Sequence, residues 1–97
     1  MNGIKMDKFY DLISHYHEAE FEIHEKTFII QPAEDNGNTY LTIWNITTDE
    51  AKCILKRQIE AKEEISSESI DAILTEKCFE GRSFLDMEKE ITVTVIY

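Results

Sequence analysis

The most constraining feature of this chain is the run Ile91-Thr92-Val93-Thr94-Val95-Ile96-Tyr97. Apolar residues alternate with threonine, and all but the last residue are β-branched. Such a run is typical of a strand, because branched side chains pack well on a pleated surface and alternate between its two faces. The alternation puts Ile91, Val93 and Val95 on one face. We therefore expect a fold built around a β-sheet with residues 91–97 as one strand.

Three further segments read as strands. Glu20-Phe21-Glu22-Ile23-His24 alternates strictly, and Thr27-Phe28-Ile29-Ile30 reads as its return strand, with the turn near residues 24–26. We expect Pro32 to end this pair, because proline cannot donate to a ladder. Residues 33–38 read as a loop around Asn36-Gly37, and residues 40–46 as the third strand.

Two segments have helical periodicity. Phe9, Leu12, Ile13 and Tyr16 fall on one stripe, which predicts a helix over about residues 5–17. A second helix is expected to begin at Ser66 or Ser67 and to be stopped by Gly81. Ser83 is expected to cap a short turn after it.

Residues 47–65 fit two structures. Thr47 and Glu50 could form a capping box before a helix, yet residues 52–57 also read as a strand that returns from Ile46. The strand is slightly favoured. The predicted fold class is therefore α+β: an antiparallel sheet of four or five strands with an N-terminal helix and one or two further helices, in the order α-β-β-β-(β or α)-α-β.

Composition limits the partners. The 97 residues suffice for one domain, and 20 acidic against 10 basic residues give a net charge of −10. The excess is spread evenly, so the charge either only keeps the surface soluble or attracts a basic partner. Direct nucleic-acid binding is not expected, because phosphates need a basic face. Apolar runs are too short for a membrane span.

No motif predicts catalysis, a cofactor or a metal. His15, His17 and His24 have no spacing that would form a closed ligand set, and nucleophile and phosphate-binding motifs are absent. Cys53 and Cys78 lack a CxxC spacing and are expected to be small core residues. No signal-peptide pattern is visible, so we expect a cytoplasmic protein with reduced thiols.

Four residues are candidates for a binding surface. Glu20 and Glu22 share the strand face opposite Phe21, and Tyr40 and Trp44 share the face opposite Leu41 and Ile43. If helices cover both faces of the sheet, Tyr40 and Trp44 belong to the core. If one face is open, they are exposed aromatic anchors among acidic residues, which is a common arrangement in protein interfaces.

Three segments carry a resemblance. The run from Glu20 to Phe28, the strand from Tyr40 to Trp44, and Phe79-Glu80-Gly81-Arg82-Ser83-Phe84-Leu85-Asp86 are similar to segments of small acidic proteins from Gram-positive bacteria and their phages and mobile elements. The resemblance implies no particular activity. It implies a mobile-element protein that binds a host protein.

Two functions remain open at this point. The first is a non-catalytic acidic protein that inhibits or neutralises a basic, nucleic-acid-handling partner, as anti-CRISPR, antirestriction or immunity proteins do. The second is a cytoplasmic interaction domain, or a homodimer formed through a sheet edge, whose acidity serves only solubility. The distribution of carboxylates should separate them, since a dense acidic face favours the first function and an even coat the second.

Overall fold

A computed structural model describes residues 1–97 and shows an α+β fold, as the sequence predicts. Its sheet has five strands in the order β4-β3-β2-β1-β5, and every pair of neighbouring strands is antiparallel. The elements are α1 (Met6–Ser14), β1 (Ala19–Ile23), β2 (Lys26–Asp35), β3 (Asn38–Asn45), β4 (Lys52–Ile59), α2 (Ser67–Thr75), the short 3-10 helix η1 (Glu88–Glu90) and β5 (Ile91–Ile96).

The ambiguous segment forms strand β4, which confirms the favoured alternative. Leu55 lies opposite Ile43 of β3, and both pack with the core. Thr47 does not cap a helix. Its hydroxyl donates to Asn45 Oδ1 at 2.6 Å and accepts from the backbone N–H of Thr27 at 2.9 Å, so this side chain closes the end of the β2–β3 pair instead.

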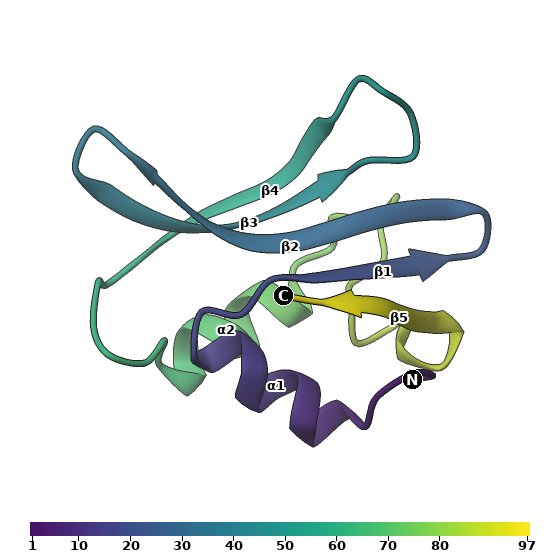
Figure 1. Ribbon diagram of the computed structural model, residues 1–97, viewed down its shortest axis with the longest axis horizontal. Coiled ribbons are helices and arrows are strands. Elements are labelled where there is room, and N and C mark those ends of the chain that lie inside the picture. The colour runs from purple at the N-terminus through teal and green to yellow at the C-terminus, as the bar shows by residue number, and fades with distance from the viewer.

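Both helices cover the same face of the sheet and leave the other face open (Figure 1). The core between the helices and the sheet contains 19 buried residues. All five phenylalanines belong to it and form one chain of ring contacts, in which Phe84 stacks on Phe9 and meets Phe21 edge-on, each at 5.2 Å between ring centroids. Phe28 and Phe79 extend this chain from Phe21. We call the uncovered side the open sheet face.

The two edges of the sheet differ. Beside β5, the N–H of Asn2 donates to Ile91 O and its C=O accepts from Val93 N, both at 2.9 Å. Gly3 follows with φ +88°, and a Cβ there would lie 2.3 Å from Val93 O, so only glycine fits this close approach. The N-terminal residues therefore cover part of the β5 edge, while β4 pairs only with β3.

Two predicted boundaries in the first third of the chain were wrong. Helix α1 ends at Ser14 rather than near residue 17, because Tyr16 has φ +66° and donates its hydroxyl to Lys62 O at 2.6 Å. Pro32 does not end the hairpin, since β2 continues through it. Strand β1 stops opposite Ile30, so Pro32 has no β1 neighbour that would need its missing N–H.

The second helix begins as predicted but ends early. Ser66 caps α2 by accepting from the N–H of Ser69 at 3.2 Å, and the helix ends at Thr75. Gly81, with φ +88°, lies instead in a tight turn in which Phe79 pairs with Arg82. Ser83 forms the expected short turn, in which its hydroxyl accepts from the N–H of Asp86 at 3.0 Å.

Candidate functional site

The open sheet face carries all four predicted binding residues. Glu20 and Glu22 project from β1, and Tyr40 and Trp44 from β3, on the side opposite the buried Phe21, Leu41 and Ile43. The register thus places all four on one surface, and for Tyr40 and Trp44 it matches the alternative in which one sheet face is open. The alternative, that helices cover both sheet faces, was wrong, because both helices pack on one side (Figure 1).

Register places Glu20 and Trp44 in one row across the sheet. Glu20 lies opposite Ile29 of β2, and Ile29 lies opposite Trp44. Val95 of β5 and Cys53 of β4 complete the row at its two ends. We call these five residues the cross-strand row. Because neighbouring strands are about 4.8 Å apart, the Cα atoms of Glu20 and Trp44 are about 10 Å apart, which one bound segment could span.

The Trp44 side chain is held in place before any partner binds. Its indole N–H donates to Thr42 Oγ1 at 3.0 Å, and the Thr42 hydroxyl donates to Gln31 O at 2.8 Å. Thr42 is only 1% exposed although it points to the open sheet face. Trp44 is therefore a partly exposed aromatic residue whose orientation is fixed, so that little side-chain entropy is lost on binding.

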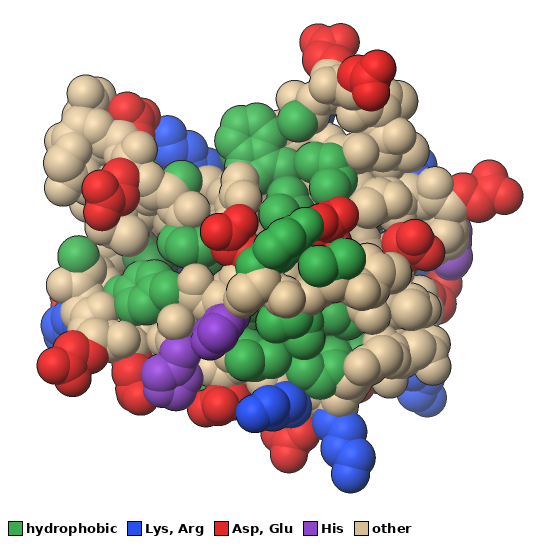
Figure 2. All heavy atoms as spheres, in the orientation of Figure 1, with side chains coloured by type: hydrophobic (Ala, Val, Ile, Leu, Met, Phe, Trp, Pro, Cys, Tyr) green, Lys and Arg blue, Asp and Glu red, His purple; other side chains and the backbone are tan.

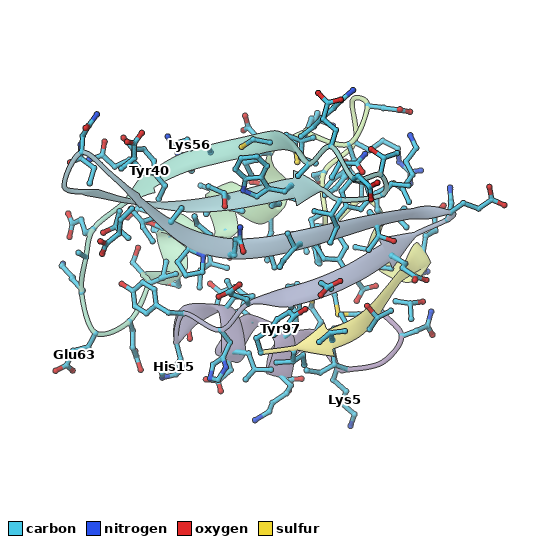
Figure 3. The ribbon with its side chains drawn as sticks, turned by 45° about the horizontal axis from the view of Figure 1, so that its top comes forward. Lys5, His15, Tyr40, Lys56, Glu63 and Tyr97 are labelled. Carbon is cyan, nitrogen blue, oxygen red and sulfur yellow. The ribbon has the colours of Figure 1, made fainter.

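Tyr40 is already engaged. Lys56 Nζ lies 4.4 Å from the centroid of the Tyr40 ring and 3.1 Å from Asp35 Oδ2 (Figure 3). The hydrogen bond that Lys56 donates to the Asp35 carboxylate raises the pKa of Lys56. A partner cation would have to displace Lys56 to stack on the same side of this ring. Tyr40 thus contributes less to a site for a basic partner than Trp44 does.

The acidic end of the open sheet face lies on β1. The hydroxyl of Tyr97 donates to Glu20 Oε2, and this hydrogen bond, followed by desolvation, raises the pKa of Tyr97. Glu22 is exposed between Thr27 and Thr92, which flank it across the sheet. Strands β1 and β5 contain no Lys or Arg, so nothing basic on them offsets these two carboxylates.

Apolar surface adjoins these carboxylates. Val95 and Ile96 are each 40% exposed, and Tyr97 is 58% exposed. Hydrophobic side chains reach the surface in the centre of Figure 2, with carboxylates near them and others spread around the outline of the molecule. On this side, then, the acidic residues form a dispersed coat rather than one dense face. A dispersed coat is the distribution expected if the acidity serves only solubility, so the overall spread of carboxylates does not favour a basic partner. The feature that indicates binding is local: apolar surface lies beside Glu20 and Glu22.

Sequence reasoning missed three members of the row, Ile29, Val95 and Cys53. Ile29 follows Phe28 and precedes Ile30, and a strand cannot turn three consecutive apolar residues to one face. That signal could have placed Ile29 on the open sheet face. Val95 was expected beside Val93 on the buried face, but a register shift between Glu20 and Phe21 sets Val95 opposite Glu20.

The histidines lie apart from the row and from one another. His15 Nε2 lies 2.7 Å from Glu64 Oε1, His17 Nδ1 lies 2.7 Å from Tyr97 O, and His24 Nε2 lies 2.8 Å from Glu90 Oε1. No group of three or more His, Cys, Asp or Glu side chains is placed to hold a metal ion.

The two cysteines differ from each other, and only Cys53 lies away from the core. Cys53 is exposed, so its predicted core position was wrong: the strand register turns it toward the open sheet face beside Trp44. Cys78 is partly buried, and burial raises the pKa of its thiol to about 11. A thiol with that pKa is almost fully protonated near neutral pH and is a poor nucleophile.

The function of this chain has to be inferred from its structure. Comparison with protein-family models, curated proteins and solved structures finds no match to this chain. None of its helices is both long and apolar enough to cross a membrane. The residues that stand out chemically are therefore those of the cross-strand row, together with Glu22.

Proposed function

We propose that this chain is a non-catalytic protein-binding domain that uses its open sheet face to bind a basic partner. The observation that carries the proposal is the cross-strand row, in which the fixed indole of Trp44, the apolar Ile29 and the carboxylate of Glu20 lie side by side. An aromatic anchor next to apolar surface supplies contact area, and adjacent carboxylates select cationic side chains.

The sign of the net charge suits a basic partner, although the dispersed carboxylates alone would equally serve solubility. The chain carries a net charge of −10, so its field attracts cationic proteins over roughly the Debye length of 8 Å and beyond it at low salt. Near contact, Glu20 and Glu22 determine which end of the sheet the cations meet. A partner whose basic groove normally binds nucleic acid would be inhibited by competition for that groove, and this is the form of inhibitor that the proposal favours.

Self-association through a sheet edge receives less support. Asn2 occupies part of the β5 edge. Pairing β4 with a second β4 would bring two copies of Lys52, Lys56 and Arg57 together, and like charges opposite one another destabilise strand pairs. An edge-to-edge homodimer is therefore the weaker alternative.

Affinity capture with charge-matched variants tests the proposal. The face variant carries Glu20→Lys and Glu22→Lys. The control variant carries Glu63→Lys and Glu68→Lys in the loop before α2 and in its first turn, where Glu63 points away from the sheet (Figure 3). Each Glu→Lys change adds two positive charges, so both variants have a net charge of −6 instead of −10.

We expect the wild type and the control variant to capture the same basic protein, and the face variant to lose it. An excess of nucleic acid should then release the captured protein if the two compete for one groove. Capture that survives reversal of both glutamates, or that both variants lose equally, would contradict the proposal, because net charge rather than the open sheet face would then determine binding.

A further inference from the structure

The β4 edge is basic, whereas the chain as a whole is acidic. Residues 51–59 contain no acid but three bases, Lys52, Lys56 and Arg57, within a chain of net charge −10. Lys56 is paired with Asp35, whereas neither Lys52 nor Arg57 lies within ion-pairing distance of a carboxylate. Two uncompensated cations therefore lie on one strand.

This strand also offers free backbone groups. Figure 1 shows β4 at the outer edge of the sheet, and it pairs only with β3. Outside that ladder, no backbone N–H or C=O of residues 52–59 bonds to another backbone group. The outward-pointing groups can pair with an added strand, which is how many domains bind extended peptides.

An apolar cleft adjoins the same edge. It has a volume of about 510 Å³, and Ile54 of β4 lines it together with Phe28, Phe79 and Met87. A register shift between Ile43 and Trp44 turns both Ile54 and Leu55 toward the core side. Lys52 and Arg57 lie on that side as well, because they face Asn45 and Leu41 across the ladder. The edge thus presents apolar residues between two free cations.

We propose that β4 binds an extended acidic segment of a partner protein as a sixth, antiparallel strand. Apolar side chains of that segment would lie beside Ile54 and Leu55, at the mouth of the cleft. Its acidic side chains would face Lys52, Lys56 and Arg57. This interaction uses the β4 edge and shares only Lys56, which stacks on Tyr40, with the open sheet face. The charges of the two sites are opposite, so one chain could bind a basic surface and an acidic strand at the same time.

A synthetic peptide provides the probe. The probe is the capped octapeptide Thr-Thr-Glu-Glu-Val-Val-Thr-Glu. When it pairs antiparallel to β4, with its first residue opposite Ile59 and its last opposite Lys52, its glutamates lie opposite the three bases and its valines opposite Leu55 and Ile54. Binding is followed by chemical shifts of the ¹⁵N-labelled protein and by calorimetry. We expect shifts concentrated in residues 52–59 and slower amide exchange there.

Two matched comparisons separate strand addition from simple attraction. N-methylation of both valines leaves the charge unchanged and removes the one valine N–H that points toward β4, whichever of the two it is. We expect it to weaken binding at least about tenfold. Lys52→Glu with Arg57→Glu should weaken binding to a similar extent. Lys5→Glu with Lys8→Glu, an equal change of charge near the start of α1, should have little effect, and so should Glu20→Lys with Glu22→Lys on the open sheet face.

Several results would overturn the inference. These are absence of binding up to about 1 mM peptide, equal binding of the N-methylated peptide, equal loss in both double-charge variants, or shifts outside β4. Tighter binding of an octathymidylate at the same residues would identify a phosphate site instead. A dimer in sedimentation that the peptide dissociates would show that a second copy of the chain occupies the edge.

Discussion

Removing the Phe84 ring should destabilise the fold by an amount that can be estimated from its contacts. Phe84 is fully buried, stacks on Phe9 and meets Phe21 edge-on, each at 5.2 Å. It thereby fixes the irregular segment after α2 against α1 and β1. Phe84→Leu keeps an apolar side chain but removes two aromatic pairs, each worth about 0.5–1.5 kcal/mol. We therefore expect a loss of about 1–3 kcal/mol in the free energy of unfolding.

The neighbouring residue provides the control. Leu85 is 43% exposed, so Leu85→Ala should change stability by less than about 0.5 kcal/mol. Urea denaturation followed by far-UV circular dichroism measures both values, and in a domain of this size about 1 kcal/mol corresponds to roughly 4–8 °C in Tm. If Phe84→Leu melts within about 2 °C of the wild type, or if Leu85→Ala costs as much, the ring cluster is not the packing centre that we describe.

Three further predictions concern the edge, the core and pH. Val93→Asp should cost several kcal/mol in thermal melts because the residue is 8% exposed. Thr94→Asp at the exposed next position should cost no more than about 1 kcal/mol, because it loses only the hydroxyl hydrogen bond to Glu20 O. Gly3→Ala should destabilise the fold more than Gly37→Ala, since both glycines have positive φ but only Gly3 lies against backbone. Amide exchange at Val93 should become faster in Gly3→Ala and stay unchanged in Gly37→Ala. A hydrogen bond from the His15 ring to the backbone oxygen of Asp11 raises the pKa of His15 above its usual 6.5. Protonated His15 therefore stabilises the folded state; this contribution is complete below pH 6.5 and is lost as the pH rises through the raised pKa. Tm should therefore fall more between about pH 5.5 and about pH 8.5 in the wild type than in His15→Gln, and equal slopes would refute this.

Local patterns were enough to predict the sheet but not the ends of its elements. Alternation in residues 20–24 and 91–97 identified two strands because each has one buried face. The early end of α1 depends on Tyr16, whose hydroxyl bonds to Lys62, far away in sequence. Likewise, Pro32 is tolerated only because β1 stops opposite Ile30. Neither contact leaves a signal near the boundary that it determines.

The sequence was enough to predict individual residues of the candidate site, but not that they lie together on one exposed surface. Alternation placed Glu20, Glu22, Tyr40 and Trp44 on strand faces, yet whether those faces are open depends on where the helices pack. The fixed indole of Trp44 and the stacking of Lys56 on Tyr40 arise from cross-strand neighbours, which only the register reveals. The basic β4 edge was equally hidden, because its segment could have formed a helix.

The salt dependence of partner affinity tests the central claim most directly. The affinity of the captured, purified partner is measured by calorimetry at about 50 mM and about 300 mM salt, with the wild type, the Glu20→Lys/Glu22→Lys variant and the equally charged Glu63→Lys/Glu68→Lys variant. Binding through the open sheet face to a basic partner predicts that the wild type weakens steeply with salt, that the first variant binds at least about tenfold more weakly at low salt, and that the second variant stays close to the wild type. Affinity that is insensitive to salt and unchanged by reversal of Glu20 and Glu22 would contradict the claim.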